Sequence, residues 1–534
     1  MKRLLTILSA LLLFASLNTT AFAQDKAKPE DDGRAGDGQP LAKAHPSWKV
    51  EKVRSAEWEP QVGALAWSPD GKHLAVLTFN PRRTGATGDY NGQLHIIENG
   101  TSVDVTKQKR TKVSEELILP LGAYWLPEGL FVLERHEISK WTDEDGDGIP
   151  ETKNTHASGW ISSNFHDFSF GLGYHDGYLY GALSTSLHLS QEDRDSAVAN
   201  PDDPIAGQIS DSKGKTRGGN APNHEFRGCV MKVSVETGEI EWIAGGLRTP
   251  NGVGTGPEGI VLVPDNQGDF KPSNGIYVPK GGEFFGKYNA TFSTESHPDG
   301  GVPSMYSDKE PTPPAIWLPQ NEVGNSPSAT LLIPEGKPFA GQVLSADLTQ
   351  GAIHRIYMEE VDGTWQGVVF RHTMGLEGGP NDIKWGPDGC LYVGAMGSGG
   401  SGGWGWGKTL FGLERLRPTG ETAFEYEKIE TTKDGFKVTF TEPVKAGQLD
   451  KLDNWEVTAW TYVAKPFYGG PKIEEHKANI TGVKVSEDRT SAELIVDGRR
   501  PNFVYHIRID ATSDKGEKMW SPESWLTFHK APKK

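Results

Sequence analysis

One short pattern recurs along most of this chain: a polar turn with Asp-Gly or Glu-Gly, followed by a run of alternating β-forming residues. These turns are centred on Asp70, Glu128, Asp176, Glu258 and Asp388. Asp-Gly between two such runs is a strong local signal of a β-hairpin. The long interval before Asp388 contains a further strand pair, residues 341–347 and 351–357. The pattern therefore predicts six similar β units.

Six irregular β repeats without helical periodicity are typical of a six-bladed β-propeller, in which few sheet edges are exposed. We place this propeller at residues 48–422. A pair of β-sandwiches is the alternative, but it does not explain why one turn recurs six times. Residues 423–534 instead carry short, cleanly alternating strands such as 436–441 and 504–509. They predict a small Ig- or fibronectin-like β-sandwich, so the expected fold class is all-β.

The N-terminal residues have the pattern of an export signal. Lys2 and Arg3 precede an apolar run, residues 4–15, and a small-x-small site ends at Ala23. This order is typical of a removable signal peptide, here residues 1–23, followed by a flexible linker, residues 24–47. The apolar run is too short to span a bilayer. We therefore expect a periplasmic or secreted protein without membrane insertion.

The charge and the cysteine content argue against a nucleic-acid-binding protein and against a fold held by disulfides. The formal net charge of −16 argues against nucleic-acid binding, which needs a basic surface. The two cysteines, Cys229 and Cys390, lie in different predicted units. Buried thiols are therefore a better expectation than a disulfide framework.

An acidic segment in the second unit predicts a metal site. Asp143, Asp145 and Asp147 alternate before Gly148, as in the first half of an EF-hand-type Ca²⁺ loop. The carbonyl of Ile149 and the carboxylate of Glu151 complete the expected ligand set. Since close carboxylates repel one another without a cation, we expect Ca²⁺ to bind here and clamp a hairpin. The alternative is a solvated acidic turn.

Two residues share a register that points to a catalytic pair. His166 lies ten residues before Asp176, and Arg248 lies ten residues before Glu258. Equal offsets predict equivalent positions in successive units, close together at the central channel. Histidine is a suitable base near neutral pH, and an adjacent guanidinium binds a carboxylate or an oxyanion. The alternative is that both residues are structural.

Three segments resemble the glucose/sorbosone dehydrogenase family: Gly-Leu-Arg-Thr-Pro-Asn-Gly from Gly246, Asp-Asn-Gln-Gly from Asp265, and Gly-Gly-Glu-Phe-Phe-Gly from Gly281. The resemblance covers roughly residues 60–417. It implies a six-bladed propeller that oxidises a sugar with pyrroloquinoline quinone (PQQ) and Ca²⁺. His166 would then take the hydroxyl proton and Arg248 would assist it. The implied cofactor-binding residues are Gln267, Gly268, Asn251 and Asn266.

The same alignment shows departures from the family. A lysine and two arginines that hold the anionic quinone in the family correspond here to Thr349, Gly379 and Asn381. PQQ carries three carboxylates, so losing three cationic partners weakens its binding. Either other cations replace them, or the protein does not use PQQ. The candidate replacements are Arg371, Lys280 and Arg83.

Three functions follow from the sequence. The first is a sugar dehydrogenase-like oxidoreductase acting on a carbohydrate or other small polyol, with PQQ or a periplasmic electron acceptor. The second is a cofactor-free carbohydrate lyase or hydrolase that uses His166 and Arg248. The third is a non-catalytic module that binds a glycan or a protein.

Overall fold

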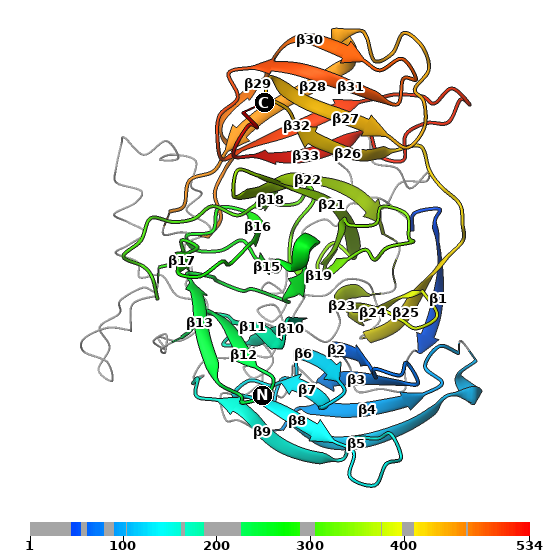
Figure 1. The fold of residues 1–534 in the computed structure, drawn as a ribbon, viewed down its shortest axis with the longest axis vertical. Coiled ribbons are helices and arrows are strands. Elements are labelled where there is room, and N and C mark those ends of the chain that lie inside the picture. Colours follow the sequence, from blue (N-terminus) through cyan, green and yellow to red (C-terminus); the bar gives the residue numbers. More distant parts are fainter. Residues whose placement is uncertain are drawn as a thin grey trace, which may run out of the picture.

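The computed structural model describes residues 44–54, 61–79, 90–102, 104–161, 166–185, 226–288, 305–374, 376, 378–397, 411–465 and 468–533. These residues form β-strands and short 3-10 turns, Val105–Lys107, Pro257–Gly259 and Leu452–Asn454 (Figure 1). The all-β class is thus confirmed. None of the described helices has the length and apolar character needed to cross a membrane. The expected signal peptide lies outside the described residues.

Six sheets follow one another along residues 62–418. The first strand given for each sheet below is its first strand within this range of the chain. The first sheet has β2 (Val62–Trp67), β3 (His73–Phe79), β4 (Gly92–Glu98) and β5 (Lys109–Leu117). The second has β6 (Gly122–Leu126), β7 (Gly129–Leu133), β8 (Glu137–Thr142) and β9 (Thr152–Ser158). The third has β10 (Ser169–His175), β11 (Tyr178–Leu183), β12 (Val230–Ser234), β13 (Ile240–Gly245) and the short parallel strand β17 (Glu283–Phe284).

The remaining three sheets repeat this order. The fourth has β14 (Gly254–Thr255), β15 (Val261–Asp265), β16 (Asn274–Tyr277) and β18 (Ile316–Leu318). The fifth has β19 (Pro327–Leu332), β20 (Val343–Asp347), β21 (Ala352–Val361) and β22 (Thr364–Thr373). The sixth has β23 (Gly379–Trp385), β24 (Leu391–Met396), β25 (Phe411–Pro418) and the N-terminal strand β1 (Trp48–Arg54).

The recurring turn joins the first strand to the second in five of these sheets, as the pattern predicts. At Asp176 and Gly177 the φ angles are 47° and 81°, and at Glu258 and Gly259 they are 57° and 78°. A tight type I′ hairpin turn requires positive φ angles at both of its central residues. In the fifth sheet the predicted pair is the second and third strands, β20 and β21. Its first turn contains Pro334-Glu335-Gly336, with Gly336 at φ 82°.

The first strands of the six sheets contact one another in chain order, β2, β6, β10, β14, β19 and β23, and β23 contacts β2 again. The sixth sheet takes only three strands from its own part of the chain. β1 supplies the outer one, since it pairs antiparallel with β25 from Trp48↔Pro418 to Arg54↔Leu413. The first and last parts of the six-sheet region are therefore held in one sheet.

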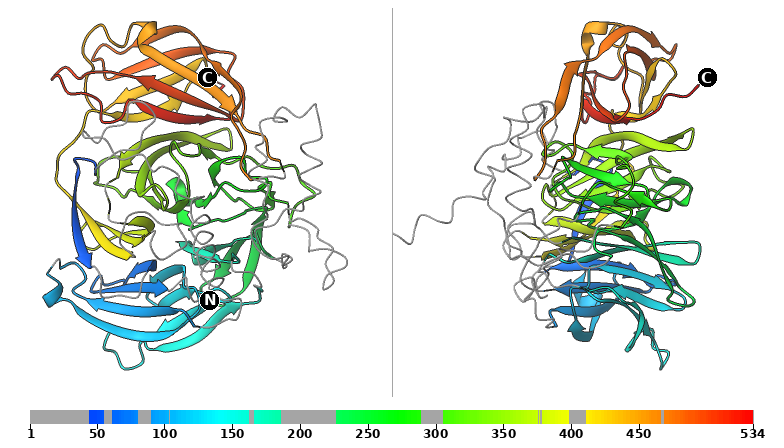
Figure 2. Two further views of the ribbon diagram at one scale, coloured as in Figure 1. Left: turned by 180° about the vertical axis from the view of Figure 1, so that it is seen from behind. Right: turned by 90° about the vertical axis from the view of Figure 1, so that its left-hand side faces the viewer.

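The C-terminal residues add two sheets on one side of this region (Figures 1 and 2). One has the order β26 (Tyr426–Thr431), β27 (Gly435–Phe440), β31 (Ser491–Asp497) and β30 (Asn479–Val485). The other has β33 (Glu523–Phe528), β32 (Phe503–Ile509), β28 (Trp455–Thr461) and β29 (Ile473–Lys477). The two sheets share one core, with Phe436, Trp455 and Tyr505 among its members. β33 also pairs with β22, so the fifth sheet continues into the C-terminal sheets.

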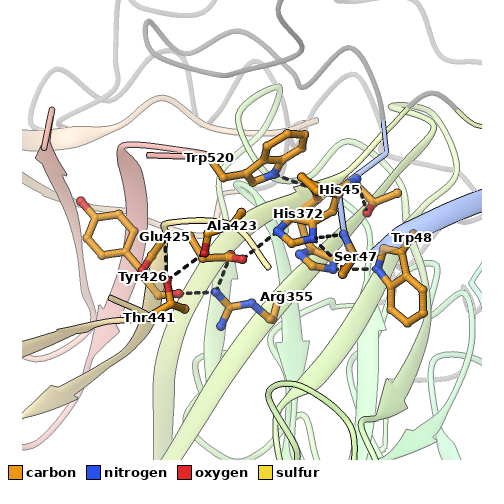
Figure 3. Close-up of polar contacts among 12 residues, drawn as sticks. His45, Ser47, Trp48, Arg355, His372, Ala423, Glu425, Tyr426, Thr441 and Trp520 are labelled. Carbon is orange, nitrogen blue, oxygen red and sulfur yellow. Dashed lines mark hydrogen bonds and ion pairs between the residues drawn. The ribbon is translucent and has the colours of Figure 1, made fainter. Parts of the chain in front are cut away.

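A buried polar cluster joins the N-terminal strand, the fifth sheet and the start of the C-terminal sheets (Figure 3). The Nε2 atom of His45 lies 2.7 Å from Oε1 of Glu425, and Nη2 of Arg355 lies 3.0 Å from Oε2 of the same carboxylate. The His45 ring stacks on His372 with centroids 4.4 Å apart. His45 belongs to the expected flexible linker, yet it is only 1 % exposed. Residues 44–47 are thus part of the packed structure.

Candidate functional site

A narrow cavity lies where the six first strands meet. Every one of the six sheets, or the turn that leads into it, contributes to its wall. The lining includes Gly63, Gly122, Gly171, Asn251, Thr330 and Asp382. The centre of a water molecule can occupy only about 20 Å³ of it, which is room for one or two waters. A sugar ring does not fit inside this cavity.

His166 lies just before β10 and is 5 % exposed. Its Nδ1 is 3.0 Å from the carbonyl oxygen of Thr185, which follows β11. A carbonyl only accepts hydrogen bonds, so Nδ1 carries the proton when the ring is neutral. Nε2 is then the basic nitrogen of the imidazole.

Arg248 lies between β13 and β14, and its backbone is held firmly. The carboxylate of Asp265 accepts the N–H groups of Arg248 and Thr249, at 3.0 and 2.6 Å. The N–H and hydroxyl groups of Thr185 both donate to the carbonyl oxygen of Arg248, at 2.8 and 3.2 Å. Thr185 therefore joins His166 to Arg248. Neither of these two residues belongs to the lining of the narrow cavity.

The guanidinium of Arg248 lies between the backbone of Gly268 and the ring of Tyr468. Its Cζ is 5.0 Å from the centroid of that ring. A Cβ atom on Gly268 would lie 2.3 Å from Nε of Arg248, so the side chain occupies the space that glycine leaves open. The sequence motifs above do not include Tyr468. The one local signal is the sequence Tyr468-Gly469-Gly470, in the connection between β28 and β29.

Two buried lysines lie close to this arginine and are also absent from the predicted set. Nζ of Lys271 is 3.1 Å from Oδ2 of Asp265, and Nζ of Lys287 is 2.5 Å from Oδ2 of Asp269. Burial lowers the pKa of Lys271 to about 8, although Asp265 opposes this shift. Burial alone would raise the pKa of Asp269, but Lys287 and Arg248 lower it below its usual value.

More buried positive charge lies near Asp167, the residue that follows His166. Asp167, the next residue, is fully buried and interacts electrostatically with Arg135 and Arg227. Burial lowers the pKa of Arg227 to about 10, so this guanidinium still carries its charge at neutral pH. Two arginines thus interact with the aspartate that follows His166 in the chain.

Two of the residues expected to contact PQQ, Gly268 and Gln267, have hydrogen-bond partners in the protein. The carbonyl oxygen of Gly268 accepts the N–H groups of Lys271 and Gly469, at 3.0 and 2.9 Å, which uses both of its lone pairs. The amide of Gln267 donates to the carbonyl of Pro272 at 3.0 Å. Two of the expected contacts to a cofactor or its metal are therefore taken by the protein itself.

The two asparagines of the expected cofactor set differ from each other. Asn251 donates to Oδ1 of Asn381 at 3.2 Å, and Asn381 itself donates to the carbonyls of Val62 and Gly63. Asn266 donates to Oγ of Ser326 at 3.1 Å, and its buried Oδ1 has no partner among the described residues. Asn266 therefore keeps a buried oxygen atom available for a ligand, whereas the amide nitrogen of Asn251 is engaged by Asn381.

The candidate replacement cations do not complete a quinone site. Arg371 forms an ion pair with Glu523, and Lys280 donates to the carbonyl of Gly363 at 2.6 Å. Arg83 lies outside the described residues. Within the described ranges, the donor set therefore does not fit PQQ, because its cations are replaced or engaged and its carbonyl contact is saturated.

Two groups of metal-binding side chains bring three ligand atoms within 4.8 Å of one another in the part of the chain that the structure describes. The first is exposed and lies between β8 and β9: Asp143, Asp145 and Glu151. Hard carboxylate oxygens suit Ca²⁺. The expected ligand Asp147 is not in this group, and its Oδ1 accepts the N–H of Ile149 at 2.8 Å. The ligand role of Ile149 stays a prediction.

The second group is the buried cluster of His45, His372 and Glu425. Here Nε2 of His372 accepts the indole N–H of Trp48 at 3.0 Å. Arg355 already neutralises Glu425. A positive guanidinium beside the carboxylate disfavours a second cation, so this group is better explained as a structural contact.

Comparisons with known proteins give distant similarities only. No family model and no curated protein matches the chain. A glucose dehydrogenase-type oxidoreductase of Thermus thermophilus is 16 % identical, covering 69 % of this chain and 100 % of its own, with a TM-score of 0.42. The PQQ-bound aldose sugar dehydrogenase of Streptomyces coelicolor is 14 % identical, covering 70 % and 99 %, with a TM-score of 0.42.

A gluconolactonase of Xanthomonas campestris is similar over a comparable length of chain: 12 % identity, 73 % of this chain, 96 % of its own, and a TM-score of 0.36. With TM-scores below 0.5, none of these similarities decides an activity. The chain is thus an all-β protein with distant structural similarity to sugar dehydrogenases and gluconolactonases.

Proposed function

We propose that this chain is an exported six-bladed β-propeller with a C-terminal β-sandwich, and that it acts on a carbohydrate at the mouth of the central channel. The cyclic contacts of the six first strands support the propeller, and β1 completes its last blade. The shared core of the last two sheets supports the sandwich. The narrow cavity on the axis supports a site at the channel mouth rather than inside it.

The observation that carries the chemical proposal is the connection of His166 to Arg248 through Thr185. The carbonyl of Thr185 fixes the tautomer in which Nε2 of His166 is a base. The same residue holds the backbone of Arg248, whose guanidinium pairs well with a carboxylate or an oxyanion. A base and an anion-binding group are thus held by one residue.

This pair suits removal of a proton from a sugar carbon that bears a carboxylate. Nε2 of His166 takes the proton on the carbon next to the carboxylate, and Arg248 stabilises the negative charge that develops there. The electron pair then forms a carbon–carbon double bond, while the bond to the glycosidic oxygen breaks and that oxygen takes a proton from water. The proposed activity is therefore a cofactor-free lyase acting on an acidic glycan.

The proposal is tested by incubating the purified protein with uronic-acid-containing oligosaccharides without any electron acceptor. We expect products with an unsaturated, ultraviolet-absorbing ring, and a loss of activity of about 100-fold or more in His166→Ala. Shortened but saturated products would instead indicate hydrolysis. Sugar oxidation that requires added PQQ and a dye acceptor would overturn the lyase and restore the dehydrogenase.

A separate metal site is part of the proposal. Asp143, Asp145 and Glu151 bind Ca²⁺ on the outer hairpin of the second blade and hold β8 and β9 together. Their converging ligand atoms support this role. The loop belongs to an outer hairpin, away from the first strands that line the channel, so the role is structural.

A further inference from the structure

The connection between β28 and β29 leaves the C-terminal sheets and docks on the turn between β15 and β16. Figure 1 shows this orange segment descending from the C-terminal sheets toward the six-sheet region. Three backbone hydrogen bonds hold it there: Phe270 to the carbonyl of Lys465 at 2.8 Å, Gly469 to that of Gly268 at 2.9 Å, and Gly470 to that of Pro272 at 2.9 Å. The contact is therefore a defined backbone interface beside Arg248.

The close approach depends on glycine at Gly469. Its φ of +73° is in the left-handed region, and a Cβ atom there would lie 2.7 Å from the side chain of Gln267. A residue with a side chain would be strained at this φ, and the end of the Gln267 side chain would have to move. The tight contact fixes the position of the preceding residue, Tyr468, which forms an isolated β-bridge with Asp269.

Tyr468 is half exposed, at 50 %, although it packs over a charged group. A tyrosine ring that is fixed in place and open to solvent offers an apolar face to a ligand. Carbohydrate rings present C–H groups on one face and are suited to stacking on such a ring. The phenol ring therefore has the properties of a sugar-binding platform.

Arg248 has the complementary property: it is 5 % exposed, and its Nε is buried without a hydrogen-bond partner. Among the described residues, no side-chain nitrogen of Arg248 donates a hydrogen bond to a protein acceptor. The carboxylates nearby are each paired with a lysine, Asp265 with Lys271 and Asp269 with Lys287. Of these three buried cations, Arg248 is the one that makes no ion pair or side-chain hydrogen bond among the described residues, although its charge also acts on Asp269.

We infer that Tyr468 and Arg248 together form the subsite for a carboxylated sugar, with the sugar packed against the exposed part of the Tyr468 ring and the carboxylate paired with Arg248 at the edge of that ring. The C-terminal sandwich thus supplies a specificity-determining residue to the propeller. The inference rests on the proposed function for its substrate class, but it concerns binding and not turnover. It explains why the sandwich sends a connection to this one turn of the propeller.

The test uses the full chain and two probes, D-glucuronate and D-glucose, which differ in the carboxylate. Binding is measured by calorimetric titration at low salt. We expect the wild type to bind glucuronate at least tenfold more tightly than glucose. Tyr468→Ala weakens glucuronate binding at least tenfold, whereas Tyr468→Phe keeps the ring and stays within about threefold of the wild type.

Tyr178→Ala is the matched control, because Tyr178 is also exposed, at 37 %, and has the amino group of Lys232 4.2 Å from its ring centroid. This variant keeps wild-type affinity.

The inference is overturned if the wild type binds neither sugar, if glucose binds as tightly as glucuronate, or if Tyr468→Ala binds like the wild type. His166→Ala separates the two proposals: it retains glucuronate binding while turnover is lost. Binding with the expected pattern but no turnover in the wild type would overturn the enzyme and keep the subsite.

Discussion

His45 and Glu425 are 2.7 Å apart, although 380 residues separate them in the chain. The imidazole and the carboxylate are both almost completely buried, at 1 % and 4 % side-chain exposure. Arg355 binds the other oxygen of Glu425, so one carboxylate joins β1, the fifth sheet and the C-terminal sheets (Figure 3). The contact therefore connects the residues before β1 with the fifth sheet and with the residue before β26.

We expect His45→Ala to lower the free energy of unfolding by about 3 kcal/mol, because it leaves a buried carboxylate with one partner fewer. The midpoint of thermal unfolding then falls by several degrees. Lys49→Ala is the control: Lys49 lies four residues after His45, at the start of β1, but its side chain is 62 % exposed and pairs with Glu51 at the surface. Equal midpoints for the two variants would show that the buried cluster adds no stability.

The second junction between the fifth sheet and the C-terminal sheets predicts a dependence on pH. Glu523 of β33 pairs with Arg371 of β22, and Nε2 of His506 lies 3.1 Å from its other oxygen. Burial raises the pKa of Glu523, but His506 and Arg371 outweigh it and lower the pKa from 4.5 to about 2. A lowered pKa in the folded state stabilises the protein above pH 4.5, and this contribution is lost as the pH falls toward 2.

The test compares the thermal midpoints of the wild type and Glu523→Gln from pH 6 to pH 3. We expect a large difference at pH 6 that shrinks at lower pH, because the wild type alone loses the charged pair. Other carboxyls, such as Asp347, have raised pKa values, and the comparison cancels them. Glu456→Gln is the control, since the side chain of Glu456 is 70 % exposed. A difference that stays constant over this range would contradict the prediction.

How much of this fold follows from the sequence depends on whether the signal is local. A hairpin such as Asp176-Gly177 is encoded by residues that tolerate left-handed angles, so its turn is predictable. The first turn of the fifth sheet, Pro334-Glu335-Gly336, carries the same type of signal but lies outside the predicted set. The pairing of β1 with β25 has no local signal, because the two strands come from opposite ends of the six-sheet region.

The same distinction applies to the site. Equal spacing from equivalent turns predicts that His166 and Arg248 are close, and the structure connects them through Thr185. Tyr468 comes from a different set of sheets, so no spacing within the repeats relates it to Arg248. The partners that occupy Gly268 and Asn381 are also set by tertiary contacts. Sequence motifs therefore indicate which residues come close together in this site. They do not show which of the polar atoms are already occupied by hydrogen bonds within the protein.

The acidic loop predicts a response to calcium. If Asp143, Asp145 and Glu151 bind Ca²⁺ only in the folded state, Ca²⁺ at ten to one hundred times its Kd stabilises the protein by about 1–3 kcal/mol. We expect Ca²⁺ to raise the thermal midpoint and chelation to reverse the change. Asp145→Asn removes the response, whereas Asp453→Asn, which alters an exposed residue elsewhere, keeps it. An identical midpoint with and without Ca²⁺ would leave the loop as a solvated turn.

Because Arg248 occupies the space beside Gly268, we expect ligand binding to be sensitive to a substitution at Gly268. In Gly268→Ala the added methyl group would lie 2.3 Å from Nε of Arg248, so the guanidinium has to move from beneath Tyr468. We expect glucuronate affinity to fall at least tenfold, with a stability loss of about 1–3 kcal/mol from the overpacking. Gly482→Ala is the matched control, because the nearest atom to its new Cβ, on Ile495, is at an ordinary contact distance of 3.7 Å. Wild-type affinity in Gly268→Ala would mean that the guanidinium does not need its present position to hold the ligand.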